Sequence, residues 1–448
     1  MPNDAIPRTS SRLARSPGLK FLIVALLTIA MAIPLLFVQL ALSDRQQTAA
    51  GAIQDIASGW GGAQIVAGPL VLVPYTVERD SVVDGKTVHS TLRYTAVLLP
   101  DELGMKARAS EETRWRGIYA VPVYRSSVKL HATFARKALA ELAPSDAHVL
   151  WNEATVSVLV SDAHGLTENV ALTINGRTIL FQPGAGMNDQ RVTGIQARLG
   201  LSEAQDLTLD ANLALRGSRE LSLSPLGRRT TASIESAWPS PSFFGAFLPS
   251  ERTIGARGFT ASWVVPYLAR GFGQSFSTTN EVVPLLLTPA FGVRFYQPVD
   301  HYQLVQRALK YAILFVALAF LVFFVVETIS PRRLHVLHYA LVGAAQVLFY
   351  LLLLSLSEHV GFARAYLIAA GATIVLTSLY AISALANRAR AAVLFVVLAL
   401  LYGLLYIILN AEDYALLIGS TLLFVALAAT MFVTRRIDWY HVADAEMN

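Results

Sequence analysis

The sequence predicts a membrane protein of the α+β class, with one N-terminal transmembrane helix, a large antiparallel β-sandwich domain and a C-terminal bundle of five transmembrane helices. Three observations lead to this prediction. Hydrophobic residues make up 54% of the 448 residues and charged residues only 15%, against roughly 25% charged in an ordinary soluble protein. Six apolar runs approach the ~20 residues that a membrane-spanning helix needs. The long segment between the first two runs alternates apolar and polar residues over short stretches, as half-buried strands do.

The first apolar run spans residues 21–42 and is expected to be an uncleaved anchor helix. Its 22 residues exceed the roughly 7–15 of a signal-peptide core, although Ala41-Leu42-Ser43 would serve as a weak cleavage site. Pro34 lies inside the run and predicts a kink, which membrane helices tolerate. Residues 1–20 form a tail before the run, and Arg45–Ser58 is expected to continue the helix outward as a weakly amphipathic stalk.

Five more spans are predicted close together near the C-terminus, with very short connections. They cover residues 308–329, 336–357, 365–386, 391–409 and 414–434, and residues 435–448 form a C-terminal tail. The region between the first and second spans, residues 43–305, is predicted to be a separate β-rich domain.

Lysine and arginine accumulate on the cytoplasmic side of membrane spans, and their distribution orients this chain. Ten of them flank the spans on one side: Arg8, Arg12, Arg15, Lys20, Arg332, Arg333, Arg388, Arg390, Arg435 and Arg436. The alternate turns, residues 358–364 and 410–413, contain one, Arg364. We therefore expect both termini in the cytoplasm and residues 43–305 in the periplasm of a bacterium, with the lipid bilayer of the inner (plasma) membrane as the first partner.

The positive net charge does not indicate nucleic-acid binding. The chain carries +5, but Asp44–His301 holds 23 Lys and Arg against 23 Asp and Glu, so the excess lies beside the membrane spans. A nucleic-acid-binding domain would need a basic face on a folded unit. The absence of cysteine excludes disulfides, thiolate metal sites and iron–sulfur clusters.

Ten short stretches between residues 69 and 267 have the pattern of strands, separated by turn signals such as Asp84-Gly85 and Asn175-Gly176. Asn-Gly between two β-like stretches is a strong hairpin signal. One short helix is expected near Ala135–Leu142. The pattern predicts a large antiparallel sandwich, or two packed sandwiches.

Six polar residues stand at the predicted outer ends of the spans, at similar depth: Asp300, His301, Glu358, His359, Glu412 and Asp413. Such a set is able to bind a divalent cation or to act as acid and base at the periplasmic face. The alternative, which we favour, is that these residues are solvated loop ends and contacts that dock the β domain. Interfacial turns are normally polar, and topology specifies only their depth.

Residues 238–249, WPSPSFFGAFLP, combine four aromatic residues with three prolines. Proline restricts strand pairing, so a rigid loop or a sheet edge is expected. The aromatic residues would either grip a sugar or a partner, or plug the open end of the sandwich; they are Trp238, Phe243, Phe244 and Phe247. We favour the plug, because most aromatic side chains are structural. Arg114–Tyr119, RWRGIY, likewise suggests a cation–aromatic surface or the start of a strand.

The sequence contains no G-x-S-x-G, H-E-x-x-H, P-loop or EF-hand motif, so no catalytic residue, cofactor or metal site is predicted. Charged residues inside spans usually mark ion or proton pathways. Here Lys310, Glu327 and His338 lie near the ends of spans and are expected to reach the interface. The absence of a midplane carboxylate weighs against an ion-coupled transporter.

Five blocks of the sequence are long enough to be specific. They are RWRGIYAVPVY (114–124), AWPSPSFFGAFLP (237–249), GFTASWVVPYLAR (258–270), FGVRFYQPVDHYQLVQRALKYAILF (291–315) and VLFYLLLLSLSEHVGF (347–362). They resemble the CreD family of bacterial inner-membrane cell envelope integrity proteins, in order over nearly the whole chain. The resemblance implies the same plan of one helix plus five. It also implies a role in envelope integrity and in the response to cell-wall-active antibiotics under a sensor-kinase system, and it carries over no catalytic residues.

We therefore expect a non-enzymatic, multi-pass inner-membrane protein whose periplasmic β domain binds an envelope component or a cell-wall or envelope protein. Two alternatives remain open. A membrane enzyme acting on lipid-linked or cell-wall glycan would need its carboxylates ~5–10 Å apart across a cleft. A small-solute transporter would need a polar path through the helices.

Overall fold

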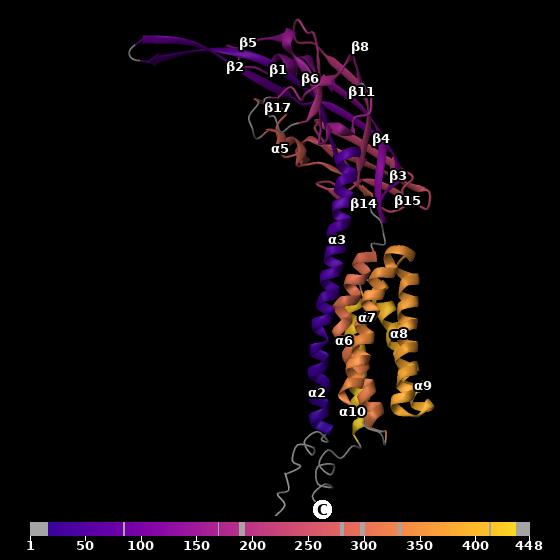
Figure 1. Ribbon diagram of the computed structural model, residues 1–448. Coiled ribbons are helices and arrows are strands. Elements are labelled where there is room, and N and C mark those ends of the chain that lie inside the picture. Colours follow the sequence, from indigo (N-terminus) through magenta and orange to yellow (C-terminus); the bar gives the residue numbers. More distant parts are fainter. Residues whose placement is uncertain are drawn as a thin grey trace, which may run out of the picture. The chain divides into compact units, whose positions relative to one another are not determined.

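The computed structural model describes residues 17–83, 86–168, 170–187, 193–277, 282–295, 301–328, 330, 334–411 and 414–435 (Figure 1). The chain divides into two compact units. One unit consists of Met1–Thr48 with Val299–Asn448, and the other of Ala49–Pro298; they are called here the helical unit and the β unit. This division confirms the mixed α+β class.

The helical unit is built from the apolar runs, because only a helix satisfies its own backbone polar groups in a bilayer. Its helices are α2 (Pro17–Ala30), α3 (Ala32–Trp60), α6 (His301–Thr328), α7 (Val336–Val360), α8 (Phe362–Leu385), α9 (Arg388–Asn410) and α10 (Ala415–Thr434). Within the described ranges, five helical stretches are long and apolar enough to cross a membrane: Lys20–Trp60, α6, α7, α8 and α9. The sixth predicted span forms α10, whose described apolar part, Leu417–Phe432, is shorter.

The helix of the first span is interrupted at Met31 and continues past the predicted membrane exit. The interruption lies three residues before Pro34, whose ring lacks the N–H that would bond the carbonyl of Ala30. The predicted stalk is helical to Trp60. The boundary between the two units therefore falls inside α3, between Thr48 and Ala49.

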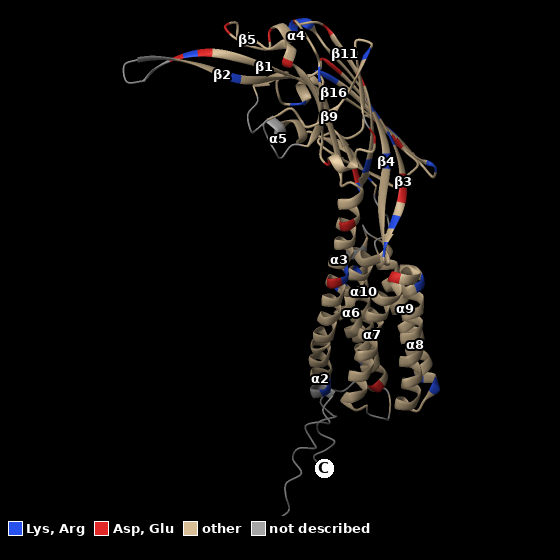
Figure 2. Ribbon diagram, turned by 45° about the horizontal axis from the view of Figure 1, so that its top comes forward, with Lys and Arg blue, Asp and Glu red and all other residues tan. Residues whose placement is uncertain are grey.

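Short connections make sequential helices neighbours, so α7 packs on α6 and α8, and α8 packs on α9. Gly361 alone separates α7 from α8. The start of α9 is capped by Asn387, whose Oδ1 accepts hydrogen bonds from the N–H groups of Ala389 and Arg390 at 2.9 and 3.3 Å. Charged residues of the described helices lie mainly near helix ends, as Figure 2 shows.

One charged pair lies buried inside the helical unit, near the end of α6. The side chain of Glu327 is only 6% exposed and forms an ion pair with Lys20. Glu327 also accepts hydrogen bonds from the Leu334 N–H and the Tyr339 hydroxyl, both at 2.7 Å, and Lys20 donates to the Leu334 carbonyl at 2.6 Å. Burial of these charges is tolerated because the two side chains neutralise each other and are hydrogen-bonded. The ion pair and its hydrogen bonds also connect α2 to α6 and α7.

The β unit contains two sheets within the described ranges. The first has ten strands: β14 (Pro241–Gly245), β18 (Phe291–Phe295), β12 (Glu220–Leu223), β1 (Gln64–Val83), β6 (Thr155–Val160), β10 (Gly194–Arg198) and β9 (Gln182–Pro183) in that order, with β2 (Lys86–Leu98) and β5 (His148–Val149) beside β1, and β17 (Ser275–Ser277) beside β2. The second has eight, in the order β15 (Glu251–Gly255), β16 (Gly258–Pro266), β13 (Arg229–Ser236), β3 (Glu102–Arg116), β4 (Tyr119–Phe134), β11 (Leu207–Ser218), β7 (Ala171–Ile174) and β8 (Arg177–Leu180).

Short helices connect some of these strands. They are α4 (Arg136–Ala140), α5 (Val282–Leu287) and the 3-10 turns η1 (Trp151–Glu153), η2 (Ala163–Gly165) and η3 (Tyr267–Ala269). The helix predicted near Ala135–Leu142 corresponds to α4. Asn175-Gly176 joins β7 to β8 as the hairpin signal predicts, with φ of 48° and 84°. Asp84-Gly85 lies outside the described residues.

The two sheets pack on each other through one hydrophobic cluster that draws side chains from both. Alternation along the strands builds this core: Leu103, Met105 and Ala107 of β3 are buried, and the residues between them face away. The sheets are antiparallel except for two pairings, β1 with β12 and β3 with β13, which are parallel. This departs from the all-antiparallel expectation, because the chain returns to pair strands that are distant in sequence.

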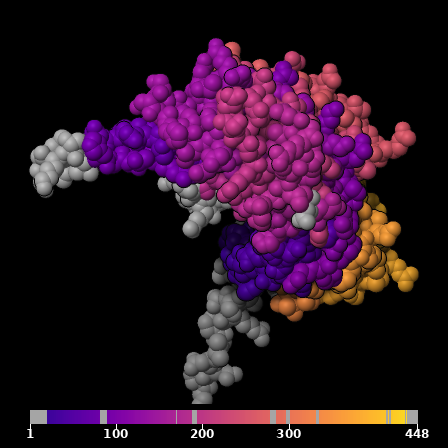
Figure 3. Space-filling model, turned by 90° about the horizontal axis from the view of Figure 1, so that it is seen from above, coloured from indigo at the N-terminus to yellow at the C-terminus, as the bar shows by residue number. Residues whose placement is uncertain are grey.

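The outer part of the β1–β2 pair forms a two-stranded ribbon. Beyond Thr76, the described residues of β1 pair only with β2. Figure 3 shows this ribbon projecting from the rest of the β unit.

The buried pair in the helical unit leads to a test. Glu327→Gln leaves the Lys20 ammonium without its counter-charge, and we expect a loss of about 3–5 kcal/mol in stability. The double variant Lys20→Met/Glu327→Met removes both charges and should be much closer to the native protein. Thermal unfolding in neutral detergent can be followed with a thiol-reactive dye at one cysteine, introduced at buried Ala312 of this cysteine-free chain. If Glu327→Gln were as stable as the double variant, the conclusion that the Lys20–Glu327 pair stabilises the protein would be contradicted.

Candidate functional site

The C-terminal end of α3 packs on one face of the second sheet, within the β unit. Ile53, Ile56 and Trp60 lie on one side of the helix, at the spacing i, i+3, i+7. They contact Val121 and Val123 of β4, which form a hydrophobic cluster on the sheet face opposite the main core. Trp60 is 8% exposed, and its indole N–H donates a long hydrogen bond of 3.4 Å to the Tyr124 carbonyl.

Three arginines surround the Trp60 indole. The guanidinium carbons of Arg114, Arg216 and Arg125 lie 3.8, 4.9 and 5.0 Å from its ring centroid. They come from three adjacent strands, β3, β11 and β4, and share one sheet face because Arg125 is paired directly with Arg216 and Arg114 with Val121. A cation over an indole face is stabilised by roughly 0.5–2 kcal/mol.

The cluster carries more positive than negative charge. Arg114 forms an ion pair with Glu112 at 2.9 Å, and Arg116 nearby on β3 pairs with Asp55 of α3 at the same distance. No carboxylate in the described part of the chain pairs with Arg125 or Arg216. The Trp60 cluster is therefore a site with two arginines available to an anion.

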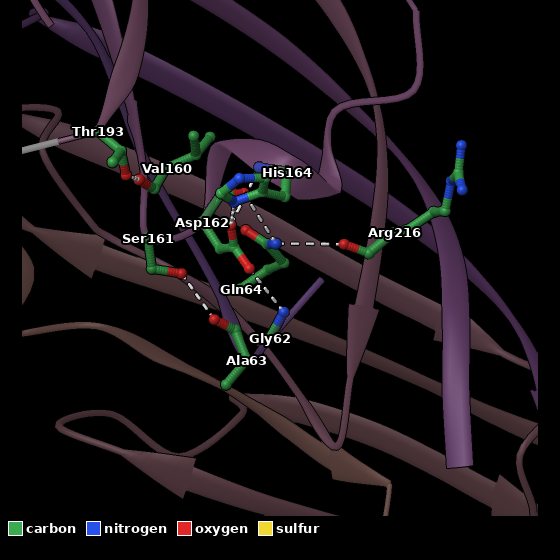
Figure 4. Close-up of polar contacts among 9 residues, drawn as sticks. All are labelled: Gly62, Ala63, Gln64, Val160, Ser161, Asp162, His164, Thr193 and Arg216. Atoms are coloured by element: carbon green, nitrogen blue, oxygen red, sulfur yellow. Dashed lines mark hydrogen bonds and ion pairs between the residues drawn. The ribbon is translucent and has the colours of Figure 1, made fainter. Parts of the chain in front are cut away.

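The chain changes from helix to strand immediately after Trp60. Gly61 has a φ of +126°, and a Cβ there would lie 2.7 Å from the Arg216 carbonyl oxygen, so the turn requires glycine. The Gly62 N–H donates to Asp162 Oδ2 at 2.9 Å. Gln64, fully buried, donates from Nε2 to the carbonyls of Asp162 and Arg216 at 3.1 and 3.2 Å (Figure 4).

Asp162 organises the other side of this turn. Its Oδ1 accepts hydrogen bonds from the backbone N–H and the ring of His164, at 3.0 and 2.9 Å. Burial alone would raise the pKa of Asp162, but the hydrogen bonds from Gly62 and His164 outweigh it and lower that pKa. In Figure 4 the Arg216 side chain extends away from this set while its carbonyl faces Gln64. The backbone carbonyl of Arg216 thus accepts a hydrogen bond in the turn, and its guanidinium stacks on Trp60 in the cluster.

The predicted polar cluster is only partly described. Asp300, Glu412 and Asp413 lie outside the described residues. The side chain of Glu358 is 6% exposed and accepts a hydrogen bond from the Tyr302 hydroxyl at 2.9 Å, with Arg45 Nε at 3.8 Å. The His301 ring centroid lies 4.1 Å from that of Tyr302. His359 is exposed, with Nδ1 3.1 Å from the Ser355 carbonyl of its own helix.

This geometry agrees better with structural contacts than with an acid–base pair. Glu358 is engaged by a cation and a hydroxyl, and the contact found for His359 is along α7. No group of three or more His, Asp or Glu that could hold a metal ion occurs among the described residues.

The aromatic segment lies mostly against the core. Trp238 packs edge-on against Phe295, Phe243 against Trp263, and Phe247 against Phe291, with centroids 6.0–6.4 Å apart. Phe244 is half-buried under the Arg294 guanidinium at 5.0 Å. Pro241–Gly245 forms β14, at the edge of the first sheet, paired with β18. The arrangement agrees with the interpretation of these rings as a plug.

The topology-determining residues are also only partly described. Arg8, Arg12, Arg15, Arg332, Arg333 and Arg436 lie outside the described residues. Arg390 donates to the Ser330 hydroxyl at 2.7 Å, and Arg435 stacks on Phe432 at 3.8 Å. Arg388 is exposed at the start of α9.

Sequence reasoning did not find the Trp60 cluster as a unit. The segment 114–119 suggested a cation–aromatic surface, but its own Trp115 is 68% exposed, and Arg114 stacks instead on Trp60, far earlier in the chain. The spacing of Ile53, Ile56 and Trp60 was a usable signal for a helix that packs on something. Nothing in the sequence indicated that Arg125 and Arg216 would be opposite each other.

Comparison with known proteins is consistent over almost the full length. A family model described as Inner membrane protein CreD matches residues 16–440. The chain is 37% identical, over 415 residues, to Inner membrane protein CreD of Escherichia coli (strain K12). That alignment covers 91% of this chain and 90% of the relative.

The packing of Trp60 can be tested by truncation. Trp60→Ala removes the largest side chain of the α3–sheet contact, and we expect a loss of about 3–5 kcal/mol in the stability of the β unit. Trp115→Ala, at an exposed position on the adjacent strand, is the matched control and should change stability by less than about 0.5 kcal/mol. Urea unfolding of the full chain, followed by pulse proteolysis, measures both. Equal losses of stability in the two variants would show that the packing of Trp60 on the sheet does not stabilise the β unit.

The lowered pKa of Asp162 predicts how stability depends on pH. Its stabilising contribution is complete above the ordinary value of 3.8 and is lost as pH falls through the lower folded value. Asp162→Asn should cost about 1–3 kcal/mol near neutral pH, from weakened hydrogen bonds, and less as the solution is acidified. Asp146→Asn, a charge loss at an exposed turn, is the control. A penalty for Asp162→Asn that grows on acidification would contradict this assignment.

Proposed function

Because the chain belongs to the CreD family of inner membrane proteins, we propose that it maintains the integrity of the cell envelope and acts in the response to cell-wall-active antibiotics. In this proposal the β unit, Ala49–Pro298, is periplasmic and both termini are cytoplasmic. The β unit binds an envelope component or a partner protein, and the helices anchor it.

The charge distribution supports the orientation. Ten lysines and arginines flank the spans on the side of the termini, and one, Arg364, lies in the alternate turns. Positive charge is retained on the cytoplasmic side during insertion, so this asymmetry supports a periplasmic β unit.

The observation that carries the binding role is the Trp60 cluster. It gathers three guanidinium groups at one indole, on a sheet face, with fewer carboxylates than arginines. Aromatic and arginine side chains dominate the energetics of binding sites. The cluster also lies at the end of α3, the helix that contains the first span, so occupancy of the cluster would act directly on an element that enters the membrane.

A binding role agrees better with the described residues than an enzymatic one. Glu358 and His359 are the best candidates for acid and base. Glu358 contacts Tyr302 and Arg45, whereas His359 contacts the Ser355 carbonyl, so the two side chains do not face one shared substrate position. The glycan-enzyme alternative would need a catalytic pair elsewhere.

The test combines cellular function with in vivo crosslinking. Cells that lack the chain should become more sensitive to a cell-wall-active antibiotic, and the native chain should restore resistance. A photo-crosslinking residue at Ser110, which is paired with Arg125 at the edge of the cluster, should give a discrete adduct. Thr208, on the same sheet face farther along the Arg216 strand, is the matched control and should give none. If resistance is restored but the residue at Ser110 gives no adduct, the proposal that the Trp60 cluster is the binding surface is wrong.

Sidedness is measured in the same cells with single cysteines, without background because the chain has none. A cysteine at exposed Thr231 of β13 should react with a membrane-impermeant maleimide in cells with a permeabilised outer membrane. A cysteine at exposed Ala389, at the start of α9, should react only after lysis. The reverse pattern would refute the orientation.

A further inference from the structure

We propose that Arg125 and Arg216, beside Trp60, form a binding site for a phosphate group. The group belongs to a lipid headgroup, to a phosphorylated soluble molecule or to free phosphate. This deepens the proposed function, on which it rests, by giving the chemical class of the envelope component.

The position of the two arginines favours a bound anion. They face each other directly across the antiparallel pair β4–β11, on the same sheet face. Directly opposed like charges destabilise a sheet. Both side chains nevertheless converge on the same ring, with guanidinium carbons 5.0 and 4.9 Å from the Trp60 centroid. The indole offsets part of the repulsion, and a bound anion would offset the remainder.

The two arginines lack neutralising groups in the described part of the chain. Glu112 is engaged by Arg114, and Asp55 by Arg116. Arg125 and Arg216 have no carboxylate partner there, and Arg216 Nε is buried without a hydrogen-bond partner among the described residues. A buried donor without an acceptor destabilises the folded protein. Such a donor is expected where a ligand supplies the acceptor.

The chemistry of the two guanidinium groups matches a phosphate group. Guanidinium groups bind phosphate oxygens through two parallel hydrogen bonds, and stacking on an aromatic ring restricts their orientation before binding. Two guanidiniums supply two positive charges, which balance a phosphate carrying two negative charges. Arg125 is exposed, so the site can be reached from solvent.

The same sheet provides a matched control. Lys106 of β3 and Lys129 of β4 are also directly opposed on this face. No ring stacks on either lysine among the described contacts. The double variants Arg125→Gln/Arg216→Gln and Lys106→Gln/Lys129→Gln therefore remove the same charge from equivalent strand positions. Only the first removes the proposed site.

The first measurement is isothermal titration of the full chain, in neutral detergent at low salt, with inorganic pyrophosphate. We expect binding to the native chain and to the lysine double variant. The arginine double variant should bind at least about tenfold more weakly, because it loses the charge-assisted hydrogen bonds of both guanidinium groups. Equal affinity in all three proteins, or no binding to any, overturns the site for soluble phosphates.

The second measurement distinguishes the sources. The chain is placed in nanodiscs of phosphatidylcholine alone or with phosphatidylglycerol, and bound lipids are counted by native mass spectrometry. Retention of phosphatidylglycerol that depends on the two arginines assigns the site to a lipid headgroup. Pyrophosphate binding without such retention assigns it to a soluble phosphate. If neither pyrophosphate binding nor phosphatidylglycerol retention depends on the two arginines, the proposal is overturned.

Thermal stability separates a ligand site from a packing role. If the arginines only clamp Trp60, the arginine double variant unfolds at a lower temperature and pyrophosphate shifts no protein. If they bind phosphate, the arginine double variant without ligand is at least as stable as the native chain, and pyrophosphate raises the unfolding temperature of the native chain and the lysine double variant but not of the arginine double variant. Adducts from Ser110 that persist in the arginine variant would refute the phosphate site while leaving the proposed function intact.

Discussion

The turn from helix to strand between Trp60 and Gln64 is the constraint on which the β unit depends. At this junction the Gly62 N–H donates to Asp162 Oδ2, and the Gln64 side-chain amide donates to the carbonyls of Asp162 and Arg216. The turn sets the direction of β1, the longest strand, which pairs with four other strands. The packing of Trp60 on β4 and the course of β1 in the opposite sheet are therefore consequences of one junction.

The two units manage charge in different ways. In the helical unit, Glu327 and Lys20 neutralise each other, because an isolated charge in a low-dielectric environment is too costly. In the β unit, water can solvate an excess charge, and Arg125 and Arg216 are directly opposed, with no carboxylate paired to either among the described residues. Only the second arrangement leaves positive charge available to a ligand. For this reason we propose that the β unit is the binding part and that the helices anchor it.

Family membership and geometry support different parts of the conclusion. The match over residues 16–440 establishes an inner membrane protein of the CreD family. The Trp60 cluster supplies a physical basis for binding that neither composition nor motif suggested. Glu358, which looked like a catalytic candidate, lies against Tyr302 and Arg45 and contributes to the structure of the helical unit.

The sequence by itself determined the features that depend on local pattern. The apolar runs predicted the helices, alternation predicted the strands, Pro34 the interruption at Met31, and Asn175-Gly176 a hairpin turn. Tertiary structure decided every feature that needs two distant segments to meet. The opposition of Arg125 and Arg216 depends on strand register, the stacking of Arg114 on Trp60 depends on where α3 packs, and the burial of Glu327 depends on a lysine more than 300 residues earlier. Local sequence predicts which backbone conformation a segment prefers, whereas side-chain partners follow from register and packing, which the whole chain determines together.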